Sequence, residues 1–436
     1  MHAQNPRQIA ARVLSQRGTS GEFTENLLET ALTTARLSTA DRGLCQELVY
    51  GVVRWQATLD RLIARKTVSG RAPRPALMNL LRLGLYQIFW LDRIPPHAAV
   101  NEMVELAKLS GYVSQAGLIN AILRGYLREF EAVKKILADM KLSQPALGWS
   151  QPDWLVERWR KTYGDEKTRA LLEWNNTPAK TYARVNTLKT DAGKLVERWR
   201  EENVEYDFIT RDWTGENLAF ELKSHPPLNA LGSFRDGWFY IQDPSTLLAV
   251  RALDPHPGET ILDLCAAPGG KAMFIAQQMD NHGRLVAHDA FADRLKLIQE
   301  NSKRLGVTCA EIVSKLEPEI SNSKFDRVLV DAPCSNTGVL RRRVDLRWLI
   351  QPHEIERSCT TQLVLLKQAA TVLKPGGILV YSTCSLEPEE NSEVVKQFLS
   401  EHAGFKLESE RQLLPFADHV DGAYVARLVH TSPLDE

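Results

Sequence analysis

From about residue 241 onward, short apolar stretches alternate with longer amphipathic ones, and this alternation limits the possible folds more than any other feature. The apolar stretches have the length and composition of buried strands, whereas the intervening ones carry apolar residues at helical spacing. The predicted strands are residues 260–264, 284–289, 326–331 and 378–382, and the clearest helices are residues 271–279 and 294–305. Repeated strand–helix alternation with apolar strands predicts a parallel, doubly wound α/β sheet.

Two other regions precede this one, and a chain of 436 residues is too long for a single core. Residues 1–140 carry apolar side chains at helical spacing and predict a helical bundle. Residues 141–240 mix helical stretches with short alternating segments such as 180–186, which predicts a small α+β subdomain. We therefore predict three domains, covering residues 1–140, 141–240 and 241–436.

Charge is balanced over the whole chain, with 54 Lys and Arg against 54 Asp and Glu, but it is uneven along it. Residues 1–140 hold 18 basic and 12 acidic side chains, a net charge of +6, and the remainder carries the opposite excess. A basic helical domain on an acidic body suits docking to a nucleic acid. A solvated helical surface with no such role is the alternative.

Cysteine usage and hydropathy indicate the compartment. None of the six cysteines stands in a C-x-x-C pair or beside a histidine cluster, so no metal site is expected. The N-terminal segment lacks the apolar core of a signal peptide, and no apolar run reaches the roughly 18 residues of a membrane span. We expect a cytoplasmic protein with reduced thiols, no membrane partner, and a monomeric state by default.

The segment from Asp263 to Lys271, DLCAAPGGK, joins a predicted strand to a predicted helix. Its small residues allow close backbone approach to a ligand at a helix N-terminus. The spacing matches neither G-x-G-x-x-G nor the P-loop. Asp289 ends the next predicted strand, where a carboxylate can accept hydrogen bonds from ribose hydroxyls. Together they indicate a nucleoside cofactor without a pyrophosphate, such as S-adenosylmethionine; a tight turn and a strand cap are the alternative.

Two cysteines, Cys334 and Cys384, follow predicted strands that end in Asp331 and Ser382. If these strands are neighbours, their carboxyl ends lie about 5 Å apart beside the cofactor. A thiolate beside a methyl donor suits methylation of pyrimidine C5, because its attack on C6 makes C5 nucleophilic. Asp331 is the candidate for stabilising charge at N3.

The other cysteines are expected to be inert, because buried thiols commonly behave as small hydrophobic groups. These are Cys45, Cys309 and Cys359, together with Cys265, which is expected to pack against the cofactor.

Three segments resemble motifs of the RNA cytosine-C5 methyltransferases: DLCAAPGGK (263–271), VDAPCSNTGVLRR (330–342) and STCSLEPEEN (382–391). The resemblance implies that Cys384 attacks C6 and that Cys334 assists breakdown of the covalent adduct. DNA cytosine-C5 methyltransferases use the cysteine after proline instead, which is Cys334 here. The resemblance also implies a set of contacts to S-adenosylmethionine: Cys265, Ala266, Ala267, Pro268, Gly269, Gly270, Lys271, Asp289 and Asp331. An acidic residue after the family's third strand has only a displaced counterpart here, Glu317.

The N-terminal region resembles the RNA-binding helical domain of the antitermination factor NusB, through residues 47–60, 81–108 and 117–129. Such a domain fused to this catalytic domain resembles the bacterial 16S ribosomal RNA methyltransferase B family. That resemblance implies a NusB-like bundle, an α+β linker subdomain and a Rossmann-like methyltransferase domain acting on a loop cytosine of 16S ribosomal RNA. The target base must be flipped out to reach Cys384, so a loop suits better than a duplex.

An arginine-rich loop follows Cys334. Its members, Arg341, Arg342, Arg343 and Arg347, are expected to contact RNA phosphates, and an exposed basic loop without that role is the alternative.

Three other functions stay open. One is the same chemistry on transfer RNA or large-subunit RNA. Another is DNA methylation, in which Cys334 forms the adduct; the resemblance favours no DNA partner. The third is a non-catalytic assembly or antitermination factor that binds RNA through residues 1–140.

Overall fold

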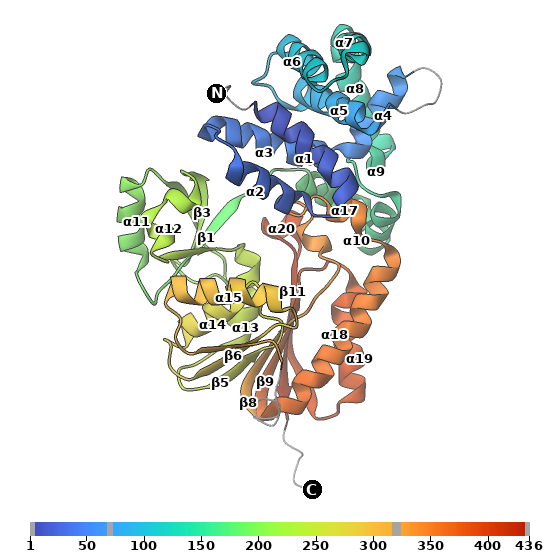
Figure 1. The fold of residues 1–436 in the computed structure, drawn as a ribbon. Helices are drawn as coiled ribbons and strands as arrows, with labels where there is room; N and C mark the ends of the chain where they lie inside the picture. The colour runs from blue at the N-terminus through green and yellow to red at the C-terminus, as the bar shows by residue number, and fades with distance from the viewer. Residues whose placement is uncertain (1–4, 68–72, 316–323, 432–436) are drawn as a thin grey trace. The chain divides into compact units, whose positions relative to one another are not determined.

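A computed structural model describes residues 5–67, 73–315 and 324–431. The chain divides into two compact units, one formed by residues 1–177 with 340–349 and the other by residues 178–339 with 350–436 (Figure 1). The first is called the helical unit and the second the catalytic unit.

The helical unit is built from helices whose starts are marked by prolines and capping side chains. Pro6, Pro75 and Pro96 stand in the first turns of α1, α5 and α6, where the missing N–H costs nothing, and Ser38 caps α3. The helices are α1 (Pro6–Ser20), α2 (Thr24–Thr34), α3 (Thr39–Arg54), α4 (Gln56–Lys66), α5 (Pro75–Trp90), α6 (Pro96–Leu109), α7 (Ala116–Arg128), α8 (Phe130–Ser143), α9 (Pro145–Gly148), α10 (Asp153–Asn175) and α17 (Leu346–Leu349). The predicted helical bundle is confirmed.

The catalytic unit begins with a four-stranded antiparallel sheet in the order β2-β3-β1-β4. Its elements are β1 (Thr181–Val185), α11 (Ala192–Glu201), β2 (Glu205–Ile209), β3 (Ala219–Ser224), α12 (Gly232–Arg235) and β4 (Phe239–Ile241). Asp191 caps α11, and the buried face of that helix places Trp199 against Phe220 and Phe239. The alternating segment 180–186 that the sequence singled out in this α+β region contains β1.

A seven-stranded sheet follows, in the order β10-β11-β9-β8-β5-β6-β7. Its strands are β5 (Thr260–Asp263), β6 (Arg284–His288), β7 (Ala310–Val313), β8 (Phe325–Asp331), β9 (Leu373–Thr383), β10 (Phe405–Leu413) and β11 (Ala423–His430). The chain runs from β5 outward to β7 and then returns to β8 on the other side of β5. Ligands of open α/β sheets bind at such a switch point, beyond the carboxyl ends of the strands.

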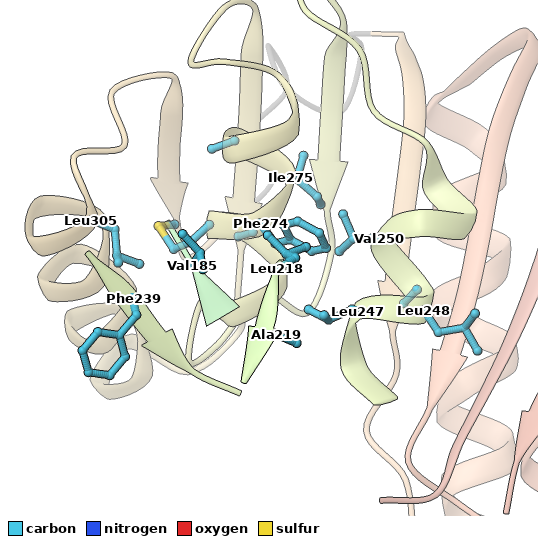
Figure 2. Close-up of a cluster of buried hydrophobic side chains, with 14 of the residues drawn as sticks. Val185, Leu218, Ala219, Phe239, Leu247, Leu248, Val250, Phe274, Ile275 and Leu305 are labelled. Atoms are coloured by element: carbon cyan, nitrogen blue, oxygen red, sulfur yellow. The ribbon is translucent and has the colours of Figure 1, made fainter. Parts of the chain in front are cut away.

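Helices cover both faces of this sheet (Figure 1). The helices α13 (Leu247–Leu253), α14 (Gly270–Gln278) and α15 (Ala292–Leu305) contribute to one buried cluster, whereas α18 (Pro352–Val372) and α19 (Ser392–Glu401) contribute to the other. Figure 2 shows that the first cluster is continuous with the small sheet, because Val185 and Phe239 belong to the same core as Phe274 and Leu305. The two sheets of the catalytic unit therefore share one hydrophobic core.

The Rossmann-like prediction is confirmed, with one difference. Strands β7, β6, β5, β8 and β9 are parallel as expected, but β11 pairs antiparallel to β9, and β10 pairs antiparallel to β11. The last two strands form a hairpin at the sheet edge, where no crossover helix is needed. The sheet is therefore mixed.

Candidate active site

The loop after β5 has glycines for two separate reasons. Gly269 has φ of 104°, a left-handed conformation that favours glycine, directly before α14. A Cβ on Gly270 would lie 2.9 Å from the Tyr240 ring. The absence of a side chain at Gly270 therefore allows the small sheet, which carries Tyr240 in β4, to pack closely against the start of α14. The loop is therefore shaped by contacts inside the protein as well as by any ligand.

Asp289 lies directly after β6 and has only 3% of its surface exposed. Its two carboxylate oxygens accept the backbone N–H groups of Ala267 at 3.2 Å and Phe291 at 3.1 Å. Arg294 lies 3.6 Å from the same carboxylate. Asp289, predicted to bind a ribose, thus connects the loop between β5 and α14 to the end of the neighbouring strand β6.

Asp263, the last residue of β5, is fully buried, and neither of its carboxylate oxygens has a hydrogen-bond partner among the described residues. Burial, and next the charge of Asp331, raise the pKa of Asp263 to about 8. A buried carboxyl without a partner is costly, so this group suits a ligand that brings a hydrogen-bond donor. The sequence placed Asp263 in the loop motif without assigning it a role.

Asp331 ends β8 and pairs with Ser382 in the register of β9. Its carboxylate accepts hydrogen bonds from the Ser382 hydroxyl at 2.7 Å and from the Lys271 ammonium at 2.6 Å. Burial alone lowers the pKa of Lys271, but the charge of Asp331, the hydrogen bond to it and the charge of Cys384 outweigh burial and raise it. Lys271, predicted as a cofactor residue, is thus the counter-ion of Asp331.

The two predicted active-site cysteines lie side by side, because β8 and β9 are adjacent parallel strands. The sulfur atoms of Cys334 and Cys384 are 3.4 Å apart. The Cys384 thiol also donates to the side-chain oxygen of Asn336 at 3.0 Å, and Asn336 has a positive φ of 59°. Asn336 was not singled out in the sequence, because its role depends on a contact between two strand ends.

The remaining cysteines stay protonated at neutral pH. Burial raises the pKa of Cys45 and of Cys359 to about 11, and it raises the pKa of Cys309 as well. The pKa of Cys265 is raised by burial and then by the charges of the neighbouring aspartates. Such thiols are poor nucleophiles.

Glycines also bring the Cys384 loop close to the end of the sheet. The Gly338 N–H donates to the Cys384 carbonyl at 2.9 Å, and the Gly422 N–H donates to the Gly338 carbonyl at 2.9 Å. A Cβ on Gly338 would lie 2.6 Å from the Cys384 carbonyl oxygen and 2.8 Å from the Gly422 Cα. No larger residue fits at Gly338 without moving the loop that carries Cys384.

The predicted arginine loop divides into buried and more exposed members of the helical unit. Arg347 is fully buried and donates to the carbonyls of Arg54 and Asn175. Arg341 is also buried, with its guanidinium 4.1 Å from the Trp174 ring. The phosphate contact expected for these two is therefore not supported, because their guanidinium groups are turned into the protein.

Arg342 and Arg343 are the two that reach a surface. They line a cavity of about 120 Å³ together with Phe23, Asn26 and Tyr50, and with the acidic residues Glu25 and Asp345. Of the four arginines, these remain the candidates for a phosphate contact.

The described parts of the chain contain no group of three or more His, Cys, Asp or Glu side chains arranged to hold a metal ion. Within the same residues, no helix is both long and apolar enough to cross a membrane. Glu317 lies outside the described residues.

A sheet with this switch point, a small-residue loop into α14 and an acidic residue after β6 define a Rossmann-like methyltransferase domain, here joined to a helical bundle and a small sheet. The family model for 16S rRNA methyltransferase RsmB/F matches residues 250–429. The NusB family matches residues 4–128, and the ferredoxin-like domain of RsmF/B-like methyltransferases matches residues 151–211.

Relatives match over nearly the full length of the chain. The ribosomal RNA small subunit methyltransferase B of Vibrio vulnificus is 36% identical, over 98% of this chain and 99% of the relative. The protein of the same name from Escherichia coli strain SMS-3-5 is 35% identical, over 98% of each chain. This chain belongs to the RsmB/F family of 16S rRNA methyltransferases.

Solved structures share the fold. The crystal structure of PH0851 covers 98% of this chain and 99% of its own, with a TM-score of 0.79 at 24% identity. A methyltransferase homolog from Pyrococcus horikoshii covers 65% of this chain and 97% of its own, with a TM-score of 0.57 at 31% identity. NSun6 from the same organism, solved with SFG, gives a TM-score of 0.56 at 25% identity, over 65% of this chain and 99% of its own.

Proposed function

We propose that this protein transfers a methyl group from S-adenosylmethionine to C5 of a loop cytosine in 16S ribosomal RNA, with Cys384 as the nucleophile. The observation that carries the proposal is the meeting of two thiols, 3.4 Å apart, beyond adjacent strand ends where Asp331 pairs with Lys271 of α14. The family description and the names of the relatives support ribosomal RNA as the substrate.

The residues around β5 and β6 fit S-adenosylmethionine. The unpaired Asp263 carboxyl suits a cationic amino group, and the Asp289 carboxylate is placed at the usual position for a ribose. The backbone from Cys265 to Gly270 and the N-terminus of α14 form the remaining wall. When bound, the cofactor supplies an electrophilic methyl group.

Cys384 forms a bond from its sulfur to C6 of cytosine, which shifts electron density to C5 and N3. Asp331 is the group proposed to face N3, and the Lys271 ammonium, 2.6 Å from its carboxylate, supplies the proton that the carboxyl group then donates to the density developing there. The C5 carbon takes the methyl group, loses its proton to a base, and the S–C6 bond breaks to release Cys384. Cys334 assists this release from its position against the nucleophile. It suits that role because its pKa is raised by the hydrogen bond to Cys384 and by burial, which keep it a thiol.

The helical unit is proposed to dock the RNA. Its basic excess lies in residues 1–140, and the exposed Arg343 adds a cation beside a cavity that also holds the carboxylates of Glu25 and Asp345. The division into domains at residues 140 and 240 and a monomeric state are parts of the same proposal.

The test is transfer of radiolabelled methyl to unmodified 16S RNA by the wild type, Cys384→Ala and Cys334→Ala, with each reaction also run on a denaturing gel. We expect Cys384→Ala to abolish both transfer and the protein–RNA adduct, and Cys334→Ala to accumulate adduct. Normal transfer by Cys384→Ala would instead make Cys334 the nucleophile. Transfer to transfer RNA, large-subunit RNA or DNA in preference to 16S RNA would overturn the substrate.

A further inference from the structure

Glu390 is a fully buried carboxylate that the mechanism above does not use. It lies in the short helix η5 (Pro388–Glu390), beyond the loop that carries Cys384. One oxygen accepts the Ser335 N–H at 2.8 Å and the Gln362 amide at 3.2 Å, and the other accepts the Ser335 hydroxyl and, at 2.5 Å, the Ser385 hydroxyl.

The two serines are the immediate neighbours of the two cysteines in the sequence. The last backbone hydrogen bond of the β8–β9 ladder runs from the Ala332 N–H to the Ser382 carbonyl, before either cysteine is reached. Beyond that point, one backbone hydrogen bond, from Gly338 to Cys384, joins the two loops among the described residues. The other contacts are made by side chains, and they include the Ser335 and Ser385 hydroxyls, whose oxygens lie 3.1 Å apart. The sulfur spacing therefore depends on side chains that the ladder does not fix.

Glu390 is itself held firmly. The Tyr381 hydroxyl donates to its backbone carbonyl at 2.5 Å. The next residue, Asn391, accepts from the Thr383 hydroxyl at 2.6 Å and donates to the Ser385 carbonyl at 2.9 Å. Because Glu390 is held in this way, it can keep Ser335 and Ser385, which it binds, in fixed positions.

We infer that Glu390 is a positioning residue, which holds Ser335 and Ser385 together and thereby keeps the Cys334 and Cys384 sulfur atoms in contact. Its importance for catalysis rests on the proposed function, whereas its effect on the sulfur spacing does not. A buried carboxylate is costly unless donors surround it. Burial raises the pKa of Glu390, and the hydrogen bonds from Ser335 and Ser385 lower that pKa and so offset part of the cost.

The charge of Glu390 has a second effect on the same pair. It adds to the causes that raise the pKa of Cys334, after the hydrogen bond to Cys384, burial and the charge of Cys384. Glu390 thus favours the thiol form of Cys334 beside a nucleophile that must ionise.

The test measures the spacing directly with phenylarsine oxide, which condenses with two adjacent thiols to form two As–S bonds and release one water. Binding to the full-length wild type is compared with binding to Glu390→Ala and Glu390→Gln. The matched control is Glu393→Gln, an exposed carboxylate three residues along the chain. Cys334→Ser sets the level for binding through one thiol.

We expect Glu390→Ala to weaken arsenical binding at least tenfold, toward the Cys334→Ser level. Glu390→Gln keeps the shape. Its amide oxygen can still accept from the Ser335 N–H and Gln362, and its NH2 group can donate to the two serine hydroxyls once these reverse, so we expect it to bind within about threefold of wild type. It removes the charge, and its Cys334 should therefore be alkylated by iodoacetamide at a lower pH. If Glu390→Ala does not fold, Ser385→Ala removes one hydroxyl tie without opening a large cavity and should weaken binding severalfold.

Folded Glu390→Ala or Ser385→Ala protein that binds the arsenical like wild type would overturn the inference. Methyl transfer is measured on the same variants, and a positioning role predicts a lower kcat with an unchanged KM for RNA. Arsenical binding needs neither RNA nor cofactor. If the variants bind the arsenical more weakly but the wild type itself transfers no methyl group, the proposed function is rejected and the positioning role stays in place.

Discussion

Individual carboxyl groups near the carboxyl ends of β5, β6 and β8 differ because their partners differ. Asp331 has the Lys271 ammonium, and Asp289 has two backbone N–H groups, but Asp263 has no hydrogen-bond partner among the described residues. In a low-dielectric interior, a carboxyl without a partner prefers its neutral form. Burial without a partner therefore raises the pKa of Asp263 above the ordinary aspartate value, to about 8.

Asp263→Asn should stabilise the protein, by an amount that depends on pH. The pKa of Asp263 is about 8 in the folded chain and lies near 3.8 in the unfolded chain, so unfolding releases its proton between these values. The native aspartate thus contributes stability that is present below pH 4 and is lost as the pH rises toward 8. We expect no gain in Tm for the variant at pH 3.5 and a gain that grows up to pH 8, measured by thermal unfolding. An equal gain at both pH values would contradict the assigned pKa.

Some residues of the candidate site could be predicted from the sequence, and others could not. Cys334, Cys384 and Asp331 stand directly at or after predicted strand ends, so the rule for parallel sheets brought them together in advance. Asn336 and Glu390 carry no such marker, because an asparagine in a turn and a glutamate before a helix are common in any protein. Their partners are distant in sequence and become visible only when β8 and β9 are placed side by side.

At the scale of elements, the segment 340–349 has a different role in the structure from the one that its sequence predicts. Asp345 accepts the Thr24 N–H at 2.5 Å at the start of α2, and the Trp348 indole donates to the Val53 carbonyl at 2.9 Å. Arg347 supplies donors to the ends of α3 and α10. A run of arginines that resembles a nucleic-acid loop is thus largely an internal brace of the helical unit.

Substitutions at Arg347 and Arg343 should separate stability from RNA binding. Arg347→Met leaves buried carbonyl groups without donors and should cost roughly 2–5 kcal/mol of unfolding free energy. Arg343→Ala, at an exposed position, should change stability by less than about 0.5 kcal/mol. It should weaken RNA binding and reduce the slope of log K against log salt by about 1. Denaturant unfolding and filter binding at several salt concentrations check both, and an unchanged salt slope for Arg343→Ala would argue against a phosphate contact.

At the scale of the whole molecule, the chain contributes to the helical unit twice, through residues 1–177 and again through residues 340–349. The NusB-like match ends at residue 128, well before either the end of α10 or the second contribution. The helical unit of this protein is therefore a discontinuous part of the chain.

A fragment of residues 1–177 should be less stable than the same residues in the full chain. Without residues 340–349 it loses the Arg347 and Trp348 donors and the Asp345 acceptor at the start of α2. We expect the backbone amides of α2, α3 and α10 that exchange slowly in the full chain to exchange much faster in the fragment, as measured by hydrogen–deuterium exchange. Supplying residues 340–349 through a flexible linker after residue 177 should restore part of the protection, whereas equal protection in the fragment and the full chain would contradict this account.

Local patterns by themselves determined the helical bundle, the strand–helix alternation and the loop that begins α14, because periodicity, prolines and glycines act over a few residues. They also determined which cysteines follow strands. Only the tertiary structure decided that β10 and β11 form an antiparallel edge, that Arg347 is buried, and that Glu390 lies behind both thiols. These outcomes depend on which distant segments come into contact and on how much surface they bury. Neither can be predicted from a few neighbouring residues.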